Sequence, residues 1–244
     1  MEAYDFRAQR LFVPDPLVGG GEIVLDRARA HYVADVIRLG LGDALHLFNG
    51  RDGEWRARRI AGARREVVLA CEAQLRPQTA PADLDYVFAP LKHARLDYMV
   101  QKAVEMGAGR LVPVITRHTQ ASRVNTERMV ANAVEAAEQC GILSVPEVLE
   151  PAPFDRWLAA LPAERVLIFC DEHAGRAEGR AALAALGSAP ACVLIGPEGG
   201  FAEPERRQLR TRVGCIPLSL GPRILRADTA AVAALALVQA AREG

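Results

Sequence analysis

The sequence has little of what marks several common classes of protein. Its 244 residues include only two lysines, Lys92 and Lys102, and its 30 basic residues balance 30 acidic ones, so no overall charge attracts nucleic acid or a membrane surface. The five cysteines form no Cys-x-x-Cys pair and the five histidines show no ligand spacing. This argues against a zinc site or a disulfide framework, so we expect no metal and a reducing, cytoplasmic location.

Long apolar runs are also missing. No run approaches the ~18 residues of a membrane-spanning helix, and the start, Met-Glu-Ala-Tyr-Asp-Phe-Arg, lacks the pattern of a signal peptide. We therefore expect no membrane contact. Half of the residues are hydrophobic, which is enough for a sizeable core, and the length fits one large domain or two small ones.

Residues 1–75 predict a small β-rich module. A helical stripe covers residues 28–39, and turn signals such as Asn49-Gly50 and Asp52-Gly53 separate apolar stretches. We expect strands at residues 10–13, 22–25, 44–48, 54–60 and 67–71. Short strands at this spacing are typical of a closed, barrel-like fold. Residues 76–82, Arg-Pro-Gln-Thr-Ala-Pro-Ala, predict a linker.

Residues 83–244 predict an α/β domain, because strand-length apolar runs now alternate with helical periodicity. We expect strands at 84–89, 111–116, 166–170, 191–195 and 216–220, and helices at 91–106, 126–140, 178–186 and 229–241. This alternation favours a mostly parallel sheet. The last helix is apolar on all sides, which indicates burial in the core or in a dimer interface.

The loop after the run at residues 191–195 predicts a ligand site. Glycine and proline at residues 196–200 exclude regular structure, and Pro204 fits the first turn of a helix. Ligands bind at such strand-to-helix loops in open α/β sheets. The loop lacks both glycine-rich phosphate-binding patterns, and its glutamates would repel a phosphate. We expect a ligand of little negative charge held by backbone groups; the alternative is a plain turn without a ligand.

Six pieces of the sequence, in order, carry a resemblance that covers both halves of the chain. They are Arg10-Leu-Phe-Val13, His31–Leu39, Gln101–Gly107, Glu138–Gly141 with Val145–Glu147, Gly196–Gly200 and Leu220–Ala230. Together they resemble the RsmE family of ribosomal RNA methyltransferases, within the SPOUT superfamily of knotted α/β proteins. The resemblance implies a PUA-like RNA-binding β-barrel followed by a trefoil-knotted methyltransferase domain. It also implies a homodimer that methylates N3 of a uridine in 16S rRNA of the small ribosomal subunit.

The resemblance further implies that two backbone loops enclose S-adenosylmethionine. A sulfonium cation without phosphate suits the acidic surroundings of the first loop. The cofactor-binding residues implied are Leu194, Ile195, Gly196, Glu198, Gly199, Gly200, Leu218, Leu220, Gly221, Ile224, Leu225 and Arg226.

Three residues are candidates for the chemistry. Removal of the N3 proton makes the uracil an anion, which a positioned cation stabilises. We expect Arg226 to be that cation, with Arg10 as a second candidate and Glu105 as the base or as a group that orients an arginine. The alternative for Arg226 is an ion pair with Asp228 that only holds the turn, and for Glu105 a solvated helix face.

Arginines gather between residues 51 and 65, where they exceed acidic residues by four. Such an excess predicts contact with RNA phosphates, although an ordinary solvated hairpin is the alternative. The RNA-binding residues expected are Arg10, Arg38, Arg56, Arg58, Arg59, Lys92 and Arg95.

The chain departs from the family pattern at Asp228, where a glutamate is usual, and at Ile142, where an arginine is frequent. Other functions therefore stay open. The chain could be a non-catalytic RNA-binding or ribosome-assembly protein of the same fold, or a methyltransferase of another RNA. It could also be an α/β enzyme on a small metabolite, with the β-rich module as a lid.

Overall fold

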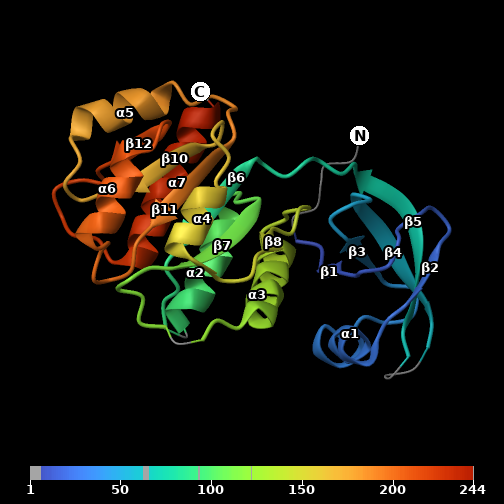
Figure 1. Ribbon diagram of the computed structural model, residues 1–244. Helices are drawn as coiled ribbons and strands as arrows, with labels where there is room; N and C mark the ends of the chain where they lie inside the picture. The colour runs from blue at the N-terminus through green and yellow to red at the C-terminus, as the bar shows by residue number, and fades with distance from the viewer. Residues whose placement is uncertain (1–6, 63–65, 93, 122, 244) are drawn as a thin grey trace. The chain divides into compact units, whose positions relative to one another are not determined.

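The computed structural model describes residues 7–62, 66–92, 94–121 and 123–243. The chain forms two compact units (Figure 1). The first contains residues up to 80 together with 137–145, and the second contains 81–136 and 146–244. The sequence predicts one continuous second domain over 83–244, so the assignment of 137–145 to the first unit is a departure from that prediction.

The first unit is built on a five-stranded sheet in the order β1-β3-β4-β5-β2, in which only β1 and β3 pair in parallel. The strands are β1 Arg10–Phe12, β2 Glu22–Val24, β3 Ala44–Phe48, β4 Glu54–Ala61 and β5 Val68–Arg76. The sheet curls around an apolar core that includes Val13, Leu47 and Leu69, each without exposed surface. The predicted PUA-like barrel is therefore confirmed as a half-barrel.

One helix of the first unit differs from its prediction. The α-helix α1, Arg27–His31, passes directly into a π-helical turn, Tyr32–Val36, in which Ile37 N donates to Tyr32 O at 3.0 Å. Arg38 then adopts a positive φ of 55°, which ends the helix. The sequence predicts a continuous helix here, because the stripe of apolar residues does not reveal the change in hydrogen-bond spacing.

The second unit is an all-parallel sheet in the order β12-β10-β11-β6-β7-β8, with β9 paired to β7. Its strands are β6 Leu84–Phe88, β7 Arg110–Ile115, β8 Glu147–Val148, β9 Ala152–Pro153, β10 Val166–Cys170, β11 Ala191–Ile195 and β12 Cys215–Leu218. Its helices are α2 Ala94–Glu105, α3 Thr126–Gln139, α4 Phe154–Ala160, α5 Arg176–Ala184, α6 Glu203–Thr211 and α7 Ala227–Glu243. The last turn of α3 belongs to the first unit. The parallel α/β sheet is confirmed; β8, β9 and α4 were not predicted, and the trefoil knot stays a prediction.

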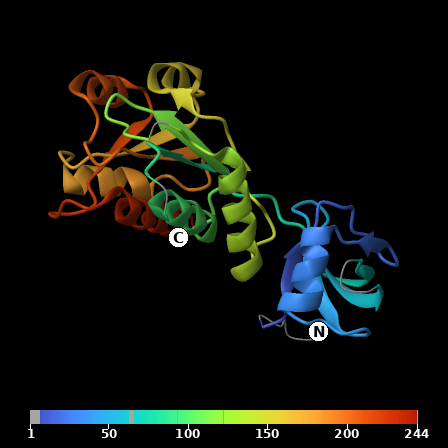
Figure 2. The same cartoon turned by 90° about the horizontal axis from the view of Figure 1, so that it is seen from below.

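Helices cover both faces of this sheet (Figure 2). On one face, Phe154 and Trp157 of α4 and Leu209 of α6 pack with Phe169 and other strand residues. On the other face lie α2 and α7, which contact each other, and α7 also contacts β11. The central strand β11 is buried along its whole length, so the loop that follows it begins at a fixed point.

The helix α7 is not buried all round. Ala231, Ala234, Leu235 and Val238 have at most 1% exposed surface, whereas Leu237 is 37% exposed. Within one chain, therefore, α7 buries a stripe and leaves an apolar face open. In the described part of the chain, no helix is long and apolar enough to cross a membrane.

Candidate active site

Strands of a parallel sheet end at the same edge, and we call this one the carboxyl edge. The loops that follow β7, β10, β11 and β12 start there and occupy residues 116–125, 171–175, 196–202 and 219–226. Ligands of open α/β sheets bind outside this edge. Both loops that the sequence predicts to hold a ligand are therefore at the expected edge.

The glycine loop, residues 196–200, is shaped partly by its own packing. A Cβ on Gly196 would lie 2.6 Å from the ring of Phe201, which stands edge-on to Phe169 with centroids 5.3 Å apart. Gly200 has a φ of 67° and donates its N–H to Pro197 O at 2.9 Å. The three atoms nearest to a Cβ on Gly199 would all belong to the side chain of His118, the closest at 3.4 Å. Gly196 and Gly200 are therefore needed for the turn itself. The packing of the loop does not require a glycine at position 199.

The segment after β7 bonds to the glycine loop at two points and to α6 at a third. His118 Nδ1 lies 3.1 Å from both Gly199 O and Gly200 O. Glu205 of α6, 9% exposed, accepts from Arg117 N at 2.8 Å with one oxygen and from Ala202 N at 2.8 Å with the other. The sequence predicts Glu205 at the positive end of α6, but not its bond to a loop 88 residues away.

Two of the predicted RNA-binding residues lie near this loop. Arg95, in the first turn of α2, forms an ion pair with Glu198 at 3.3 Å, and both side chains keep about two fifths of their surface exposed. Lys92 is exposed on the segment between β6 and α2. Arg95 therefore contacts the glycine loop, and RNA binding by Lys92 and Arg95 stays a prediction.

The second loop, residues 219–226, follows β12. Leu218 is buried and its carbonyl accepts from Asp171 N at 3.0 Å. Residues 219–225 make no backbone–backbone hydrogen bond to any residue that the structure describes. Gly221 has a φ of 124°, a conformation that favours glycine, and Ile224 is 94% exposed. The loop therefore presents backbone donors and acceptors that the fold does not use.

Arg226 stands at the end of the second loop, immediately before α7. Its side chain is exposed and its carbonyl accepts from Ala230 N at 2.8 Å. Asp228 accepts from Thr229 N at 2.8 Å, and the residues described include no ion pair between Arg226 and Asp228. The alternative in which this pair only holds the turn therefore finds no support in the structure.

Asp171, which directly follows β10, is a buried carboxylate that sequence reasoning missed. It accepts from Arg206 Nη2 at 2.7 Å and from Arg210 Nε at 2.9 Å, both on α6, and from His173 N at 3.1 Å. This cluster fixes α6 to the end of β10. The sequence did contain a signal for this cluster. An aspartate directly follows a buried strand, and two arginines four residues apart lie on one face of a later helix.

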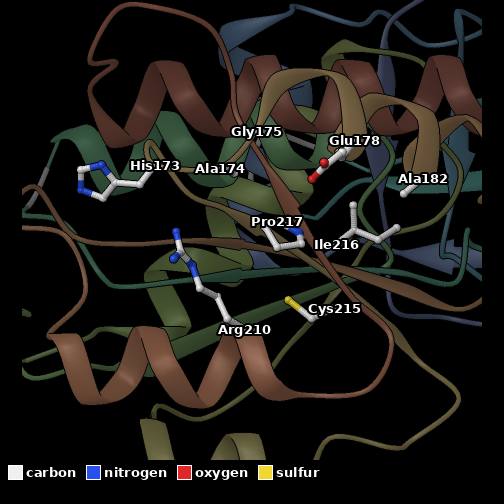
Figure 3. Close-up of a pocket in the computed structure, with 10 residues that line it drawn as sticks. His173, Ala174, Gly175, Glu178, Ala182, Arg210, Cys215, Ile216 and Pro217 are labelled. Carbon is white, nitrogen blue, oxygen red and sulfur yellow. The ribbon is translucent and has the colours of Figure 1, made fainter.

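A cavity of about 410 Å³ lies beside the carboxyl edge but does not contain either predicted loop (Figure 3). It is lined by the segment at 173–175, by α5, by Arg210 and by residues 215–217. Burial raises the pKa of the Cys215 thiol to about 11, so this group stays protonated near neutral pH and is a poor nucleophile. We place the site at the two loops, because the second carries unused backbone groups and Gly199 leaves the first open to close approach. The described residues include no cluster of three or more metal-ligating side chains.

Glu105 lies far from the predicted site within the same chain. It ends α2, whose first turn adjoins the glycine loop, and a helix of 12 residues spans about 18 Å. Its carboxylate accepts from Lys102 Nζ at 2.7 Å. This placement is at odds with Glu105 as the base, because α2 runs back to the edge of the sheet where β7 begins.

Arg10 is likewise occupied elsewhere, inside the first unit. Its Nε pairs with Glu54 at 2.5 Å, and its Nη groups donate to carbonyls at the end of α3, including Glu138 O and Ile142 O at 2.9 Å each. Glu54 has no exposed surface and also pairs with Arg76 at 2.9 Å. The guanidinium is 8% exposed and fully engaged, which is at odds with its predicted contact with RNA and with catalysis.

The hairpin arginines are exposed but partly paired. Arg56 and Arg58 of β4 both bind Glu72 of β5, and each keeps more than two fifths of its side chain exposed. The hydrogen bond from Arg58 is the main reason that the pKa of Glu72 lies below its usual value. Arg59 instead donates to carbonyls of its own unit, including Gly62 O at 2.8 Å.

Three further arginines belong to the positive charge that the sequence predicts to contact RNA. Arg38 is exposed at the end of the π-helical turn. Arg64 and Arg65, which contribute to the predicted excess of charge, lie outside the described residues.

Comparison with known proteins identifies the class. A family model described as an RNA methyltransferase domain matches residues 78–239, and one described as an RNA methyltransferase PUA domain matches residues 25–69. The first match covers more than half of the chain. The chain therefore belongs to the RNA methyltransferase family that this model describes.

Individual relatives are similar over almost their whole length. Proteins named ribosomal RNA small subunit methyltransferase E include one from Rickettsia conorii, 29% identical over 94% of each chain, and one from Bacillus subtilis, 27% identical over 85% of this chain and 86% of the other. Among solved structures, a methyltransferase of Legionella pneumophila in complex with the bound cofactor SAM is 28% identical, with a TM-score of 0.86, and covers 97% of this chain and 98% of its own. Ribosomal RNA small subunit methyltransferase E of Neisseria gonorrhoeae, bound to S-adenosyl methionine, is 25% identical, with a TM-score of 0.85 over the same shares.

Proposed function

We propose that this chain is an S-adenosylmethionine-dependent methyltransferase that modifies N3 of a uridine in 16S rRNA of the small ribosomal subunit. It acts as a homodimer in the cytoplasm. The observation that carries the proposal is the pair of loops at the carboxyl edge, in a chain whose family is RNA methyltransferases. The relatives named for small-subunit rRNA, two of them similar over most of both chains, support the choice of substrate.

The donor set at the two loops fits the cofactor. When bound, S-adenosylmethionine supplies an electrophilic methyl group on a sulfonium cation. The second loop offers backbone groups that no described residue uses, and Gly199 leaves the first loop open to close approach. No lysine and no glycine-rich phosphate cradle is present at either loop, and Glu198 is acidic. A cationic ligand without phosphate matches these features better than a nucleotide does.

Arg226 is the residue that we assign to transition-state stabilisation. The uracil that has lost its N3 proton carries negative charge on its two carbonyl oxygens. A guanidinium held at that point stabilises the charge as it develops, and such preorganised groups are often the largest single contribution to catalysis. Arg226 suits this role because its side chain is exposed at the end of the second loop and forms no ion pair among the residues described.

The RNA contacts are assigned to exposed cations of both units. Arg56 and Arg58 remain accessible although they share Glu72, and Arg38 is exposed in the same unit. In the second unit, Arg95 contacts Glu198 of the glycine loop, and Lys92 is exposed on the segment before α2. Arginine forks bind phosphates through two parallel hydrogen bonds, which suits a surface that contains almost no lysine. The open apolar face of α7 around Leu237 supports the proposed pairing with a second copy.

Mass mapping of 16S rRNA from a strain without this protein tests the proposal directly. We expect one uridine to lose a methyl group, and the purified protein with S-adenosylmethionine to restore it on rRNA or on isolated small subunits. Calorimetry should show one cofactor site per chain. Complete rRNA methylation in the deletion strain would refute the assignment, and absence of cofactor binding would favour the non-catalytic assembly protein. Turnover without RNA would favour the metabolite enzyme.

A further inference from the structure

His118 lies against the glycine loop in a way that fixes its chemical state. Its Nδ1 is within 3.1 Å of two acceptors, Gly199 O and Gly200 O. Carbonyl oxygens only accept, so Nδ1 must carry a hydrogen in either charge state of the ring. In the neutral ring the lone pair is therefore on Nε2. The side chain is exposed, so Nε2 is open to a substrate.

The backbone around His118 holds the ring in place. Thr116 N donates to Thr119 Oγ1 at 2.9 Å, and Arg117 N donates to the buried Glu205 at 2.8 Å. The segment is thus fixed on both sides of the histidine by bonds that do not involve the imidazole. A base needs such fixed orientation, because proton transfer requires hydrogen-bond geometry.

Three carboxylates at the carboxyl edge are engaged by other groups, whereas Glu172 and Glu203 are exposed there. Glu205 accepts two backbone N–H groups, and Asp171 is buried against two arginines. Glu198 is paired with Arg95. Charged groups on the elements around the imidazole are Arg117 of its own segment, Glu198 of the glycine loop with Arg95 of α2, Glu172 of the loop after β10, and Glu203 and Glu205 of α6.

We propose that Nε2 of His118 is the acceptor of the N3 proton of the substrate uracil. This inference rests on the proposed function. The N3–H bond breaks as its proton passes to Nε2, and the N3 electron pair forms a bond to the methyl carbon. The C–S electron pair remains on sulfur. The products are an N3-methyl uracil, an imidazolium and a neutral thioether, so charge and atoms balance.

A purely structural role for His118 makes different predictions. The hydrogen bonds from Nδ1 to the two carbonyls are present whether or not Nε2 is protonated. A histidine that only holds the loop therefore gives a rate that does not depend on its protonation. Proton transfer does depend on pH, because only the neutral ring accepts. His118→Asn separates the two roles, since its amide nitrogen replaces Nδ1 as a donor but offers no base. His173→Asn is the matched control, because His173 is an exposed histidine of the neighbouring loop and lines the other cavity.

The experiment measures single-turnover methylation of small-subunit rRNA against pH, at saturating cofactor, for the wild type and both variants. We expect the wild-type rate to rise tenfold per pH unit at low pH and then to level off, because only the neutral ring accepts the proton. His118→Asn should be slower by a factor of about 10² to 10⁴ on the plateau, which is the usual contribution of a general base. Across the pH range in which the wild-type rate is level, the rate of His118→Asn should keep rising with pH, because proton removal then depends on hydroxide or on prior ionisation of the uracil. His173→Asn should match the wild type.

Two measurements besides activity complete the test. Nitrogen NMR of the neutral ring should show the hydrogen on Nδ1 and the lone pair on Nε2. The affinity of His118→Asn for S-adenosylmethionine should stay within about twofold of the wild type. A wild-type rate and pH profile for His118→Asn would overturn the inference while leaving the proposed function intact. A loss of cofactor affinity equal to the loss of rate would also overturn it, in favour of loop positioning. A wild type that binds cofactor but methylates no rRNA would overturn the proposed function itself.

Discussion

Arg10 in the first unit and Arg226 in the second are the same residue type in opposite surroundings. Arg10 is 8% exposed and every part of its guanidinium bonds to Glu54 or to carbonyls at the end of α3. Arg226 is exposed, at the end of a loop whose backbone groups are unused. Both lie in motifs that resemble the same family, so the motif alone did not separate them. The burial and the hydrogen-bond partners of each arginine distinguish a structural role from a functional one. This distinction is needed here because arginine supplies almost all of the positive charge of the chain.

The largest effect is expected at the buried arginine. Arg10→Ala leaves Glu54 with one partner fewer in a site without solvent and removes the hydrogen bonds to the carbonyls at the end of α3. Loss of one member of a buried ion pair costs about 3 to 5 kcal/mol of unfolding free energy. Denaturant unfolding measures this, with Arg27→Ala, an exposed arginine, expected within about 0.5 kcal/mol of the wild type. A stable Arg10→Ala protein with reduced RNA affinity would show that Arg10 binds RNA and does not hold the first unit together.

The second effect concerns Arg226 and appears in the rate rather than in stability. Arg226→Ala should lower single-turnover methylation by a factor of about 100 or more, as removal of one oxyanion donor does. Its unfolding free energy should stay within about 0.5 kcal/mol of the wild type, because the side chain is exposed. Arg207→Ala on α6 is the control for loss of one exposed charge. A near-normal rate for Arg226→Ala at saturating RNA and cofactor would remove it from the mechanism.

Two glycines of one loop also differ in whether their substitution affects ligand binding or stability. Gly199→Val should weaken S-adenosylmethionine binding at least tenfold while the protein stays folded, because the atoms nearest to the added Cβ belong to the exposed side chain of His118. Gly196→Val should instead destabilise the protein, since its Cβ would lie 2.6 Å from the ring of Phe201. Calorimetry and thermal unfolding of both variants separate the two outcomes. Unchanged cofactor affinity in Gly199→Val would move the site away from this loop.

The smallest effect is expected at the hairpin. The double variant Arg56→Ala, Arg58→Ala should reduce the slope of log affinity for RNA against log salt by roughly 0.7 to 0.9 for each phosphate that the variant no longer binds. The stability should change little, because both ion pairs with Glu72 are exposed. Arg180→Ala with Arg207→Ala removes the same charge from α5 and α6 and is the control. An unchanged slope would identify the hairpin as a solvated surface.

Much of the fold followed from local pattern. The strands at 166–170 and 191–195 were predicted with their observed ends, because each is a continuous apolar run limited by polar or turn residues. α4 was missed because its seven residues span two turns and carry too few positions to show a period. The π-helical turn after α1 was missed for a related reason: apolar spacing reports which face is buried, not which carbonyl each N–H reaches.

The site was harder to predict because its decisive contacts join distant residues. Both ligand loops were predicted, since glycine after a buried strand has a local signature. His118 was assigned no role, because only the fold brings it to Gly199 and Gly200, more than 80 residues later. Glu105 was assigned a role from its motif, although the direction in which α2 returns places it at the other edge of the sheet. Sequence located the loops, and tertiary contacts decided which side chains serve them.

The segment 137–145 has a consequence for the synthesis of this protein. The first unit closes only when carbonyls of Ala137, Glu138, Gly141 and Ile142 reach Arg10 and Arg76. When a nascent chain has emerged only to residue 80, these carbonyls are not yet available. Arg10 and Arg76, which pair with Glu54, then lack their other hydrogen-bond acceptors. The half-barrel therefore completes its folding only after residues 81–142 have also left the ribosome tunnel. A chain cut after residue 80 lacks the segment 137–145, which belongs to the first unit.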